Sequence, residues 1–322
     1  MAQNPGGANP PVNAGPTKAK QRPGDRIFSG FSRSAGIFIL AMLVAVSAFL
    51  LGEGFPALVG DPNEISILDG GSFWAWVGPL VFGTLWAATL ALVFAFPLAI
   101  GIALFISHYA PRQIAVPLGY LVDLLAAVPS VVYGLWGGTV LAPALQPLYA
   151  WLAENASFIP FFEGPASGTG RTILTAAIVL AVMVLPIITA VSREVFLQTP
   201  VLYEEAALAL GSTRWEMIRT VVLPVGRGGI ISAAMLGLGR ALGETLAVAM
   251  VLSATGVITV NLISSVNPST IAANVALSFP EAYGLNVNAL IASGLILFAI
   301  TLVVNSVARW IVNQRKDFSG AN

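Results

Sequence analysis

Three ionisable side chains lie inside long apolar runs of the sequence. They are Asp123, Arg240 and Glu244. A charged side chain at the centre of a bilayer costs at least about 2.5 kcal/mol, and such residues normally face a water-filled path or the interior of a helix bundle. Arg240 and Glu244 are four residues apart, so on a helix they share one face and can pair directly. These three residues are therefore the candidates for a substrate pathway through a membrane.

Other interpretations of these charges stay open. Arg240, Glu244 and Asp123 could form a buried ion cluster that never meets a substrate. Asp123 either pairs with Arg240 across helices or lies near the cytoplasmic face, where water reaches it. Gly239 and Gly243 bracket Arg240 with G-x-x-x-G spacing, which lets a neighbouring helix approach closely. The glycines here lack the G-x-G-x-x-G spacing of a dinucleotide site, so such a site is rejected.

The scarcity of reactive residues excludes several kinds of site. The chain has no cysteine, which removes disulfides, thiolate metal ligands and cysteine nucleophiles. Its one histidine, His108, lies in a short connector and is interpreted as an interfacial side chain, so neither a histidine metal site nor a Ser/His/Asp triad is expected. No lysine follows a glycine as in a Walker A loop. We therefore expect no catalytic residue, no metal and no nucleotide-binding loop on this chain.

The composition indicates that membrane helices carry these residues. Of 322 residues, 57% are hydrophobic and 9% are charged, and the mean hydropathy is +0.84, whereas soluble domains carry about 25% charged residues. A helix needs about 20 apolar residues to cross a bilayer. Prolines 97, 117 and 129 fall inside the second and third apolar runs and predict kinks. Six runs predict an all-α membrane protein with six transmembrane helices: residues 35–51, 79–106, 114–141, 172–192, 229–254 and 287–311.

The predicted organisation has three parts. Residues 1–34 form a disordered cytoplasmic tail, because the first 26 residues are rich in Pro, Gly, Asn and Ala without an apolar period. Residues 35–312 form the transmembrane domain, and residues 313–322 form a cytoplasmic C-terminal tail. By the positive-inside rule both termini are cytoplasmic. Thirteen of the fifteen basic residues lie on one predicted side, and none lies in the three segments on the other side, residues 52–78, 143–170 and 255–286.

The longest cytoplasmic connector contains residues that typically begin and end helices, and their order predicts two short helices. Thr199–Pro200 resembles an N-cap followed by a first-turn proline. Gly211 suits the end of that helix. Thr213 and Glu216 have capping-box spacing, which predicts a second short helix that Pro224 closes. Segment 199–224 is therefore expected to form a helix, a glycine corner and another helix along the membrane surface.

The same segment resembles the EAA loop of the membrane subunits, or permeases, of ABC importers. The spacing agrees throughout, and the one departure is Val221, where the family usually has isoleucine. The resemblance implies that this loop docks in a cleft of an ATPase subunit and transmits its motion to the membrane helices; the alternative is an ordinary surface helix pair. The residues that carry it, and that are expected to couple to the ATPase, are Glu205, Ala206, Ala207, Gly211, Val221, Leu223 and Pro224.

Three further stretches are similar to phosphate-specific ABC importer permeases of the PstC type. They are residues 239–248 (GRALGETLAV), 129–137 (PSVVYGLWG) and 270–274 (TIAAN). With the EAA loop, the resemblance covers approximately residues 79–311 and implies the type I permease fold of ABC importers. It also implies that Arg240 and Glu244 take part in phosphate translocation, since a guanidinium can bind an oxyanion bidentately. Glu244 would then hold Arg240 between substrates.

The resemblance further implies a multi-pass protein of the bacterial plasma membrane that works inside a complex. The expected partners are a second homologous permease of the PstA type, two copies of an ABC ATPase of the PstB type and an extracytoplasmic phosphate-binding protein of the PstS type. ATP and Mg would be bound by the ATPase, so no cofactor is expected on this chain, which would not be an enzyme. It would contact membrane lipid and no nucleic acid.

Three rival functions remain at this point. One is a permease for another oxyanion, such as sulfate or molybdate, because the EAA loop is common to these importers. Another is an ion-coupled secondary carrier in which Asp123 and Glu244 bind protons or cations near the midplane. The third is a membrane-embedded hydrolase, for which histidine, cysteine and clustered acids are lacking.

Overall fold

The structure is a computed structural model that describes residues 23–313. In this range helices form the regular structure, no strand is present, and one isolated bridge joins Ala254 to Asn267. The expected tails at residues 1–22 and 314–322 lie outside the described residues. The described chain forms two compact units, which divide between Phe49 and Leu50.

Helix α1 (Pro23–Val59) begins earlier than expected, so the prediction of a disordered tail is wrong for residues 23–34. A proline in the first helical turn lacks only an N–H that has no partner there anyway, and its fixed φ suits a helix start. Large apolar side chains of α1, among them Ile37, Phe38 and Leu40, are exposed. A helix with such a surface needs lipid or another apolar helix around it.

Residues 60–313 fold into long membrane-length helices joined by short helices and turns. Five helices of the described chain are long and apolar enough to cross a membrane, and one bent pair makes a sixth candidate. The elements are η1 (Pro62–Glu64), η2 (Ser66–Leu68), α2 (Phe73–Leu104), η3 (Phe105–Tyr109), α3 (Arg112–Ala126), α4 (Ser130–Trp136), η4 (Gly137–Leu141), α5 (Ala142–Asn155), α6 (Ile173–Leu197), α7 (Val201–Ala209), α8 (Arg214–Met217), η5 (Ile218–Val222), α9 (Leu223–Leu242), α10 (Leu246–Val251), α11 (Ile271–Ser278), η6 (Phe279–Glu281) and α12 (Leu285–Asn313).

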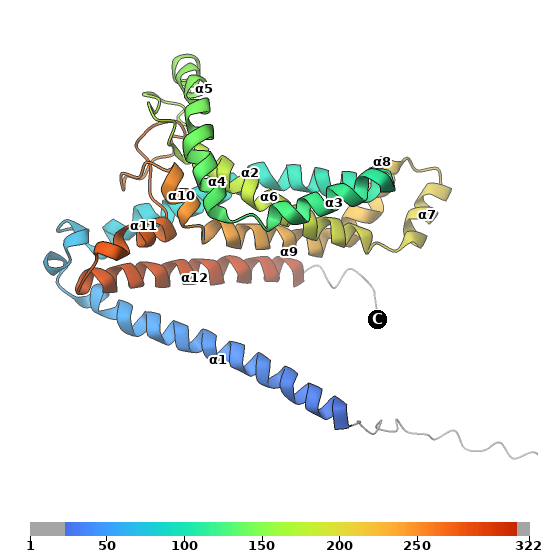
Figure 1. Ribbon diagram of the computed structural model, residues 1–322, viewed down its shortest axis with the longest axis horizontal. Coiled ribbons are helices and arrows are strands. Elements are labelled where there is room, and N and C mark those ends of the chain that lie inside the picture. Colours follow the sequence, from blue (N-terminus) through green and yellow to red (C-terminus); the bar gives the residue numbers. More distant parts are fainter. Residues whose placement is uncertain (1–22, 314–322) are drawn as a thin grey trace, which may run out of the picture. The chain divides into compact units, whose positions relative to one another are not determined.

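The core of the larger unit is the seam between α2 and α6. Residues four apart share one helix face, and α6 packs along a face of α2 that consists of single methyl groups. In lipid, helices are joined by close packing of small residues. Helix α9 packs on both α6 and α2, and α12 packs on α9, so the four helices run side by side (Figure 1). The buried alanines of the stripe are Ala87, Ala91, Ala95, Ala99 and Ala103.

The third predicted span, residues 114–141, is not one straight helix. Helix α3 meets the helical stretch Ser130–Asn155, which consists of α4, η4 and α5, at an angle of 88°. Pro129 lies at the corner, because proline supplies no N–H and keeps the residue before it out of the helical region. The Tyr133 hydroxyl donates to the carbonyl of Leu125 at 2.9 Å across the corner. Pro117, in contrast, lies inside α3 without a break.

The fifth predicted span, residues 229–254, also differs from a single helix. One continuous helix runs from Arg214 through the π-turn η5 to Leu242, so the prediction that Pro224 closes a helix is wrong. Pro224 lies inside this continuous helix directly after the π-turn, where the hydrogen-bond ladder already departs from the α-helical pattern. The chain then breaks at residues 243–245 and resumes as α10.

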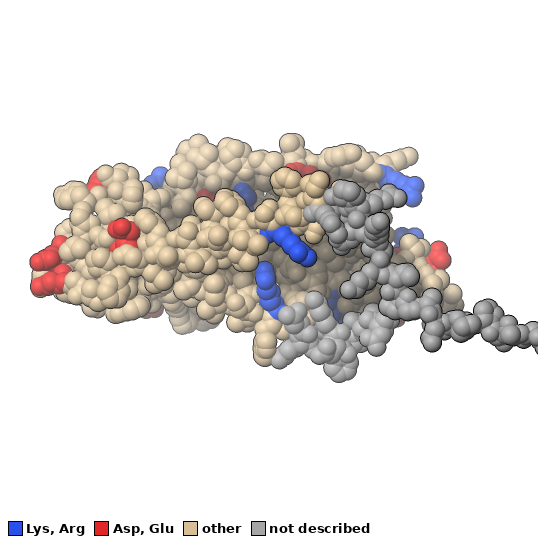
Figure 2. All heavy atoms as spheres, turned by 90° about the horizontal axis from the view of Figure 1, so that it is seen from below, with Lys and Arg blue, Asp and Glu red and all other residues tan. Residues whose placement is uncertain are grey.

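The two ends of the larger unit differ in charge. Asp61, Glu64 and Asp69 are exposed in the connection before α2. Figure 2 shows acidic side chains gathered at one end of the face in view. Helices α7 and α8 lie at the opposite end in Figure 1, where Arg214 and Arg219 are exposed. This is the charge asymmetry that predicted the orientation.

Helix α10 packs directly against Gly134 of α4. A Cβ at Gly134 would lie 2.8 Å from the Cα of Ala247 in α10, a distance that real Cβ atoms do not reach. A Cβ at Gly101 of α2 would meet nothing within 4 Å. The first glycine is thus needed for packing, and the second is not.

This contrast predicts opposite effects of the same substitution. We expect Gly134→Ala to destabilise the protein by about 1–3 kcal/mol, the usual cost of overpacking. Gly101→Ala should be neutral or stabilising, because alanine is about 1 kcal/mol better than glycine inside a helix. Thermal unfolding of the purified protein in detergent measures both. Equal stability of the two variants would mean that α10 is not seated on α4.

Candidate functional site

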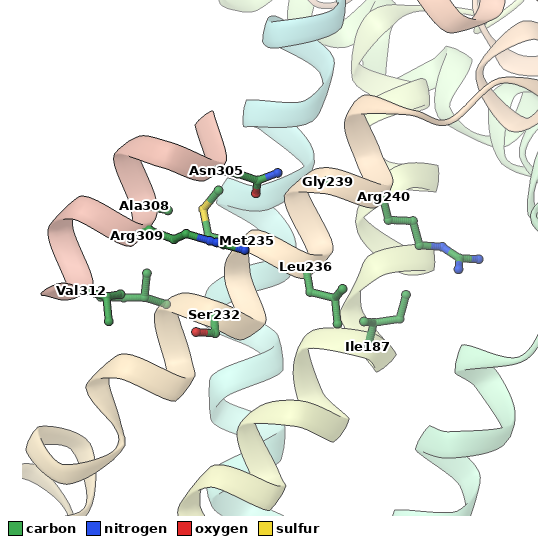
Figure 3. A pocket seen from close by; sticks show the side chains of 11 residues that line it. Ile187, Ser232, Met235, Leu236, Gly239, Arg240, Asn305, Ala308, Arg309 and Val312 are labelled. Atoms are coloured by element: carbon green, nitrogen blue, oxygen red, sulfur yellow. The ribbon is translucent and has the colours of Figure 1, made fainter. Parts of the chain in front are cut away.

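Arg240 lies in the last turn of α9 and faces a groove between α6, α9 and α12 (Figure 3). The groove has a volume of about 930 Å³. Among the residues that the structure describes, two arginines line it and no acidic side chain does. We call it the α9–α12 groove; its lining consists of Ile187, Ile231, Ser232, Met235, Leu236, Gly239, Arg240, Asn305, Ala308, Arg309 and Val312.

The predicted pairing of Arg240 with Glu244 is wrong. The i, i+4 relation requires one helix, and α9 ends at Leu242. Glu244 lies within the break between α9 and α10 and is only 8% exposed. Its Oε1 accepts the backbone N–H of Ala247 at 3.1 Å and so caps the start of α10. Among the side chains of residues 27–312 no carboxylate lies within 4.0 Å of the Arg240 guanidinium.

Asp123 pairs with a different arginine from the one expected. Its Oδ2 lies 3.6 Å from a guanidinium nitrogen of Arg193, which joins α3 to α6. The Asp123 side chain is 51% exposed, so this pair adds little to stability. The structure therefore does not bring the three predicted pathway residues together: Arg240 lines the groove, Glu244 caps a helix and Asp123 lies on α3. Their role in a pathway stays a prediction.

Sequence reasoning missed Arg309, which was counted only as a basic residue near the C-terminus. Arg309 and Asn305 are four residues apart on α12 and both line the groove. In Figure 3 the Arg309 side chain reaches toward Met235 and Ser232 of α9, whereas Arg240 extends away from them. The available signal was a polar asparagine one turn before the arginine in the last apolar run.

Segment 199–224 presents a free, partly apolar surface. Helix α7 has no buried residue. Glu205 and Ala206 are exposed, and Leu210 after α7 is 88% exposed. A cluster of exposed apolar side chains marks a surface that another protein can cover. The other large apolar side chains exposed here are Val201, Leu202, Tyr203, Leu208 and Trp215.

The local structure of this segment follows its capping residues, with one exception. Gly211 has φ +87°, as the residue after a helix C-cap requires, and its N–H donates to the carbonyl of Leu208 at 3.0 Å. The capping box of Thr213 and Glu216 is present. The expected N-cap at Thr199 is wrong, because Pro200 takes that position without a side-chain hydrogen bond. Thr199 is buried instead, and its hydroxyl has no partner among the described residues.

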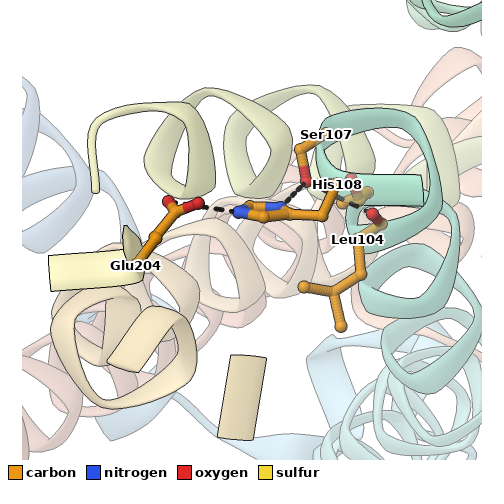
Figure 4. A network of polar contacts seen from close by, with 5 residues as sticks. Leu104, Ser107, His108 and Glu204 are labelled. Atoms are coloured by element: carbon orange, nitrogen blue, oxygen red, sulfur yellow. Dashed lines mark hydrogen bonds and ion pairs between the residues drawn. The ribbon is translucent and has the colours of Figure 1, made fainter. Parts of the chain in front are cut away.

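His108 joins this segment to the membrane helices and is not a solitary interfacial side chain (Figure 4). It lies in η3 at the end of α2, and its Nε2 is 3.4 Å from Oε1 of Glu204 in α7. Its Nδ1 is 2.7 Å from the hydroxyl of Ser107, which donates to the carbonyl of Ala103 at 2.8 Å. His108 therefore has a polar contact on each side of its ring and bridges the end of α2 to α7.

The sequence matches one family model over two thirds of the chain and is similar to curated bacterial proteins. Residues 99–317 match the family described as binding-protein-dependent transport system inner membrane component. The chain is 44% identical over 304 residues to the phosphate transport system permease protein PstC 2 of Mycobacterium tuberculosis (strain ATCC 25618 / H37Rv), with 91% of this chain and 93% of that protein covered. It is 48% identical over 241 residues to PstC of Mycobacterium leprae (strain TN), with 72% and 73% covered.

The fold is similar to that of a solved transporter. A chain of the MetNI methionine ABC transporter in an inward facing conformation matches with a TM-score of 0.50 and 17% identity, covering 73% of this chain and 95% of that chain. Sequence identity this low carries information on the fold alone. The predicted all-α fold of an ABC importer permease is confirmed, and the several apolar helices are those of a multi-pass membrane protein.

Proposed function

Because the chain belongs to the family of binding-protein-dependent transport system inner membrane components, we propose that it is the permease subunit of an ATP-driven phosphate importer. The family consists of membrane components of transporters, so the chain is not itself an enzyme. The observation that carries the substrate is the similarity to PstC proteins over most of the chain. It agrees with Arg240, which faces a groove without a carboxylate partner among the described residues.

Arg240 gives the proposed permease a site for an anion. Phosphate carries one to two negative charges, and a guanidinium offers a planar pair of N–H donors that fits two of its oxygens. No ion pair joins Glu244 to Arg240, so Glu244 does not compete for the guanidinium in this structure. In the proposed complex the second permease closes the groove from the other side, so that the path lies between the two subunits.

Segment 199–224 is the proposed contact to the ATPase, and one continuous helix leads from it to Arg240. From Arg214 to Arg240 this helix spans 26 residue steps, about 39 Å at 1.5 Å per residue. A displacement of α8 at the ATPase therefore moves Arg240 as part of the same helix. The contact of His108 with Glu204 ties α7 to the end of α2, so that a second membrane helix moves as well.

The rest of the proposed complex follows from the charge distribution and the family. Two copies of an ATPase of the PstB type bind ATP and Mg at the end that holds α7 and α8, which makes this end and both termini cytoplasmic. The acidic end lies outside and receives a phosphate-binding protein of the PstS type. The homologous partner is of the PstA type.

Labelled phosphate uptake tests the proposal directly. We expect cells that lack this chain to lose phosphate uptake at micromolar concentration, and the same cells complemented with it to regain uptake that excess sulfate does not inhibit. ATP depletion should stop uptake, whereas a secondary carrier would respond to an uncoupler instead. Unchanged uptake, or uptake abolished by sulfate, would remove the phosphate assignment.

The role of Arg240 predicts a graded response to substitution. We expect Arg240→Gln to abolish phosphate uptake, because the oxyanion loses its charged bidentate donor, while assembly of the complex is retained. Arg240→Lys should keep a small part of the activity, since it retains the charge without the planar fork. Arg227→Gln is the control: it removes an exposed arginine of the same helix that does not line the groove. Normal uptake by Arg240→Gln would contradict the role.

The His108–Glu204 contact predicts a coupling defect. We expect His108→Ala and Glu204→Ala each to lower uptake per ATP hydrolysed by about tenfold, which corresponds to about 1.4 kcal/mol of coupling. The double variant should be no worse than either single one, because both remove the same contact. Glu194→Ala, which removes an exposed acid at the end of α6, is the control. Additive losses would show that the two residues act independently.

A further inference from the structure

The two arginines of the α9–α12 groove lie at different places along it. Arg240 ends α9, whereas Arg309 belongs to α12 and reaches the stretch of α9 near Ser232 and Met235 (Figure 3). Ser232 and Arg240 are eight residues apart, which is about 12 Å along the helix. Hydrogen bonds span only about 3 Å, and the two guanidinium groups point in different directions, so one small anion does not bind both.

The surroundings of Arg309 favour an anion. Among the side chains of residues 27–312 no carboxylate lies within 4.0 Å of Arg309, and none of these acids lines the groove. Much of the wall is apolar, as at Met235, Leu236 and Ala308. Both arginines are exposed to solvent, so a dissolved anion can reach each of them.

The polar groups next to Arg309 decide what the position can hold. Asn305 lies one turn earlier on the same face of α12 and offers an amide N–H₂. The Ser232 hydroxyl donates to the carbonyl of Gly228 at 2.9 Å, so it is not a donor to a ligand. The available donors are thus the guanidinium and the amide, and both suit oxygen atoms of an oxyanion.

A basic residue near a helix end often serves only as a cytoplasmic anchor, reaching out toward lipid headgroups. Arg227 is the comparison within this chain, since it is exposed near the start of α9 and does not line the groove. Arg309 behaves differently, because its side chain lies across the groove toward α9. The guanidinium is therefore placed where it can contact a ligand in the groove.

We propose that Arg309 and Asn305 form a second oxyanion position in the α9–α12 groove, separate from that of Arg240, which takes a phosphate group. The identity of the ion as transported phosphate rests on the function proposed above. In that case the ion passes from Arg240 to Arg309 on its way to the cytoplasmic end. A phosphate group of a lipid has the same chemistry, and the experiment separates the two sources.

Thiol labelling tests the position without relying on transport. The chain has no cysteine, so Ser232→Cys places a single thiol beside Arg309. The full transport complex is reconstituted in phosphatidylcholine vesicles, and the mass of this chain reports reaction with an anionic sulfonatoethyl or a cationic trimethylammonioethyl methanethiosulfonate. We expect the anionic reagent to react about tenfold faster than the cationic one, and inorganic phosphate to slow it.

The control variants decide the outcome. With Arg309→Gln the preference for the anionic reagent and the protection by phosphate should disappear, with Arg309→Lys the preference should persist, and with Arg227→Gln both should be unchanged. A preference that survives Arg309→Gln overturns the proposal. This holds whether or not the intact complex transports phosphate, and failure of the wild-type complex to take up phosphate overturns the proposed function alone.

Two further measurements distinguish transported phosphate from a lipid headgroup as the source of the ion. If the ligand is the transported ion, Arg309→Gln lowers phosphate uptake about tenfold in phosphatidylcholine vesicles, whereas Arg227→Gln does not. If the ligand is a lipid headgroup, phosphatidylglycerol in the vesicles protects the thiol, inorganic phosphate does not, and uptake by Arg309→Gln is normal. Either result supports the oxyanion position; no protection by either ion overturns it.

Discussion

The alanine seam between α2 and α6 is the contact on which the rest of the larger unit depends. In lipid an apolar side chain gains little by leaving one hydrocarbon environment for another, so shape complementarity has to hold helices together. A stripe of methyl groups with a four-residue period supplies this complementarity along the C-terminal half of α2. Helix α9, with Arg240 at its end, packs on both members of the seam, so the position of the arginine follows from that contact.

The fold could be predicted from the sequence where a local cause is sufficient. Apolar runs located the membrane helices, and the turn after α7 and the capping box of α8 followed from Gly211, Thr213 and Glu216. The prolines were harder, because the effect of a proline depends on where in a helix it falls. Pro129 lies at a sharp corner between two helices. Pro224, in contrast, lies within one continuous helix, directly after the π-turn η5.

The candidate site was predictable only in part. Arg240 was found because its charge lies in an apolar run, but the partner assigned to it assumed a helix that in fact ends at Leu242. No residue spacing reports such a break, since Gly243 and Thr245 are tolerated inside membrane helices. Arg309 was missed for a related reason: a basic residue near a cytoplasmic helix end already has an ordinary explanation, and only the direction of its side chain distinguishes it.

The π-turn η5 separates the surface of α8 from the groove on α9 within one helix. A π-turn holds one residue more than the α-helical turn it replaces, and one residue corresponds to about 100° of rotation around the helix axis. The angular phase between the two functional faces therefore depends on this turn as well as on the number of residues between them. A change of residues on either face, or a lengthening of the helix by whole turns, leaves the angular position of Arg240 relative to α8 unchanged.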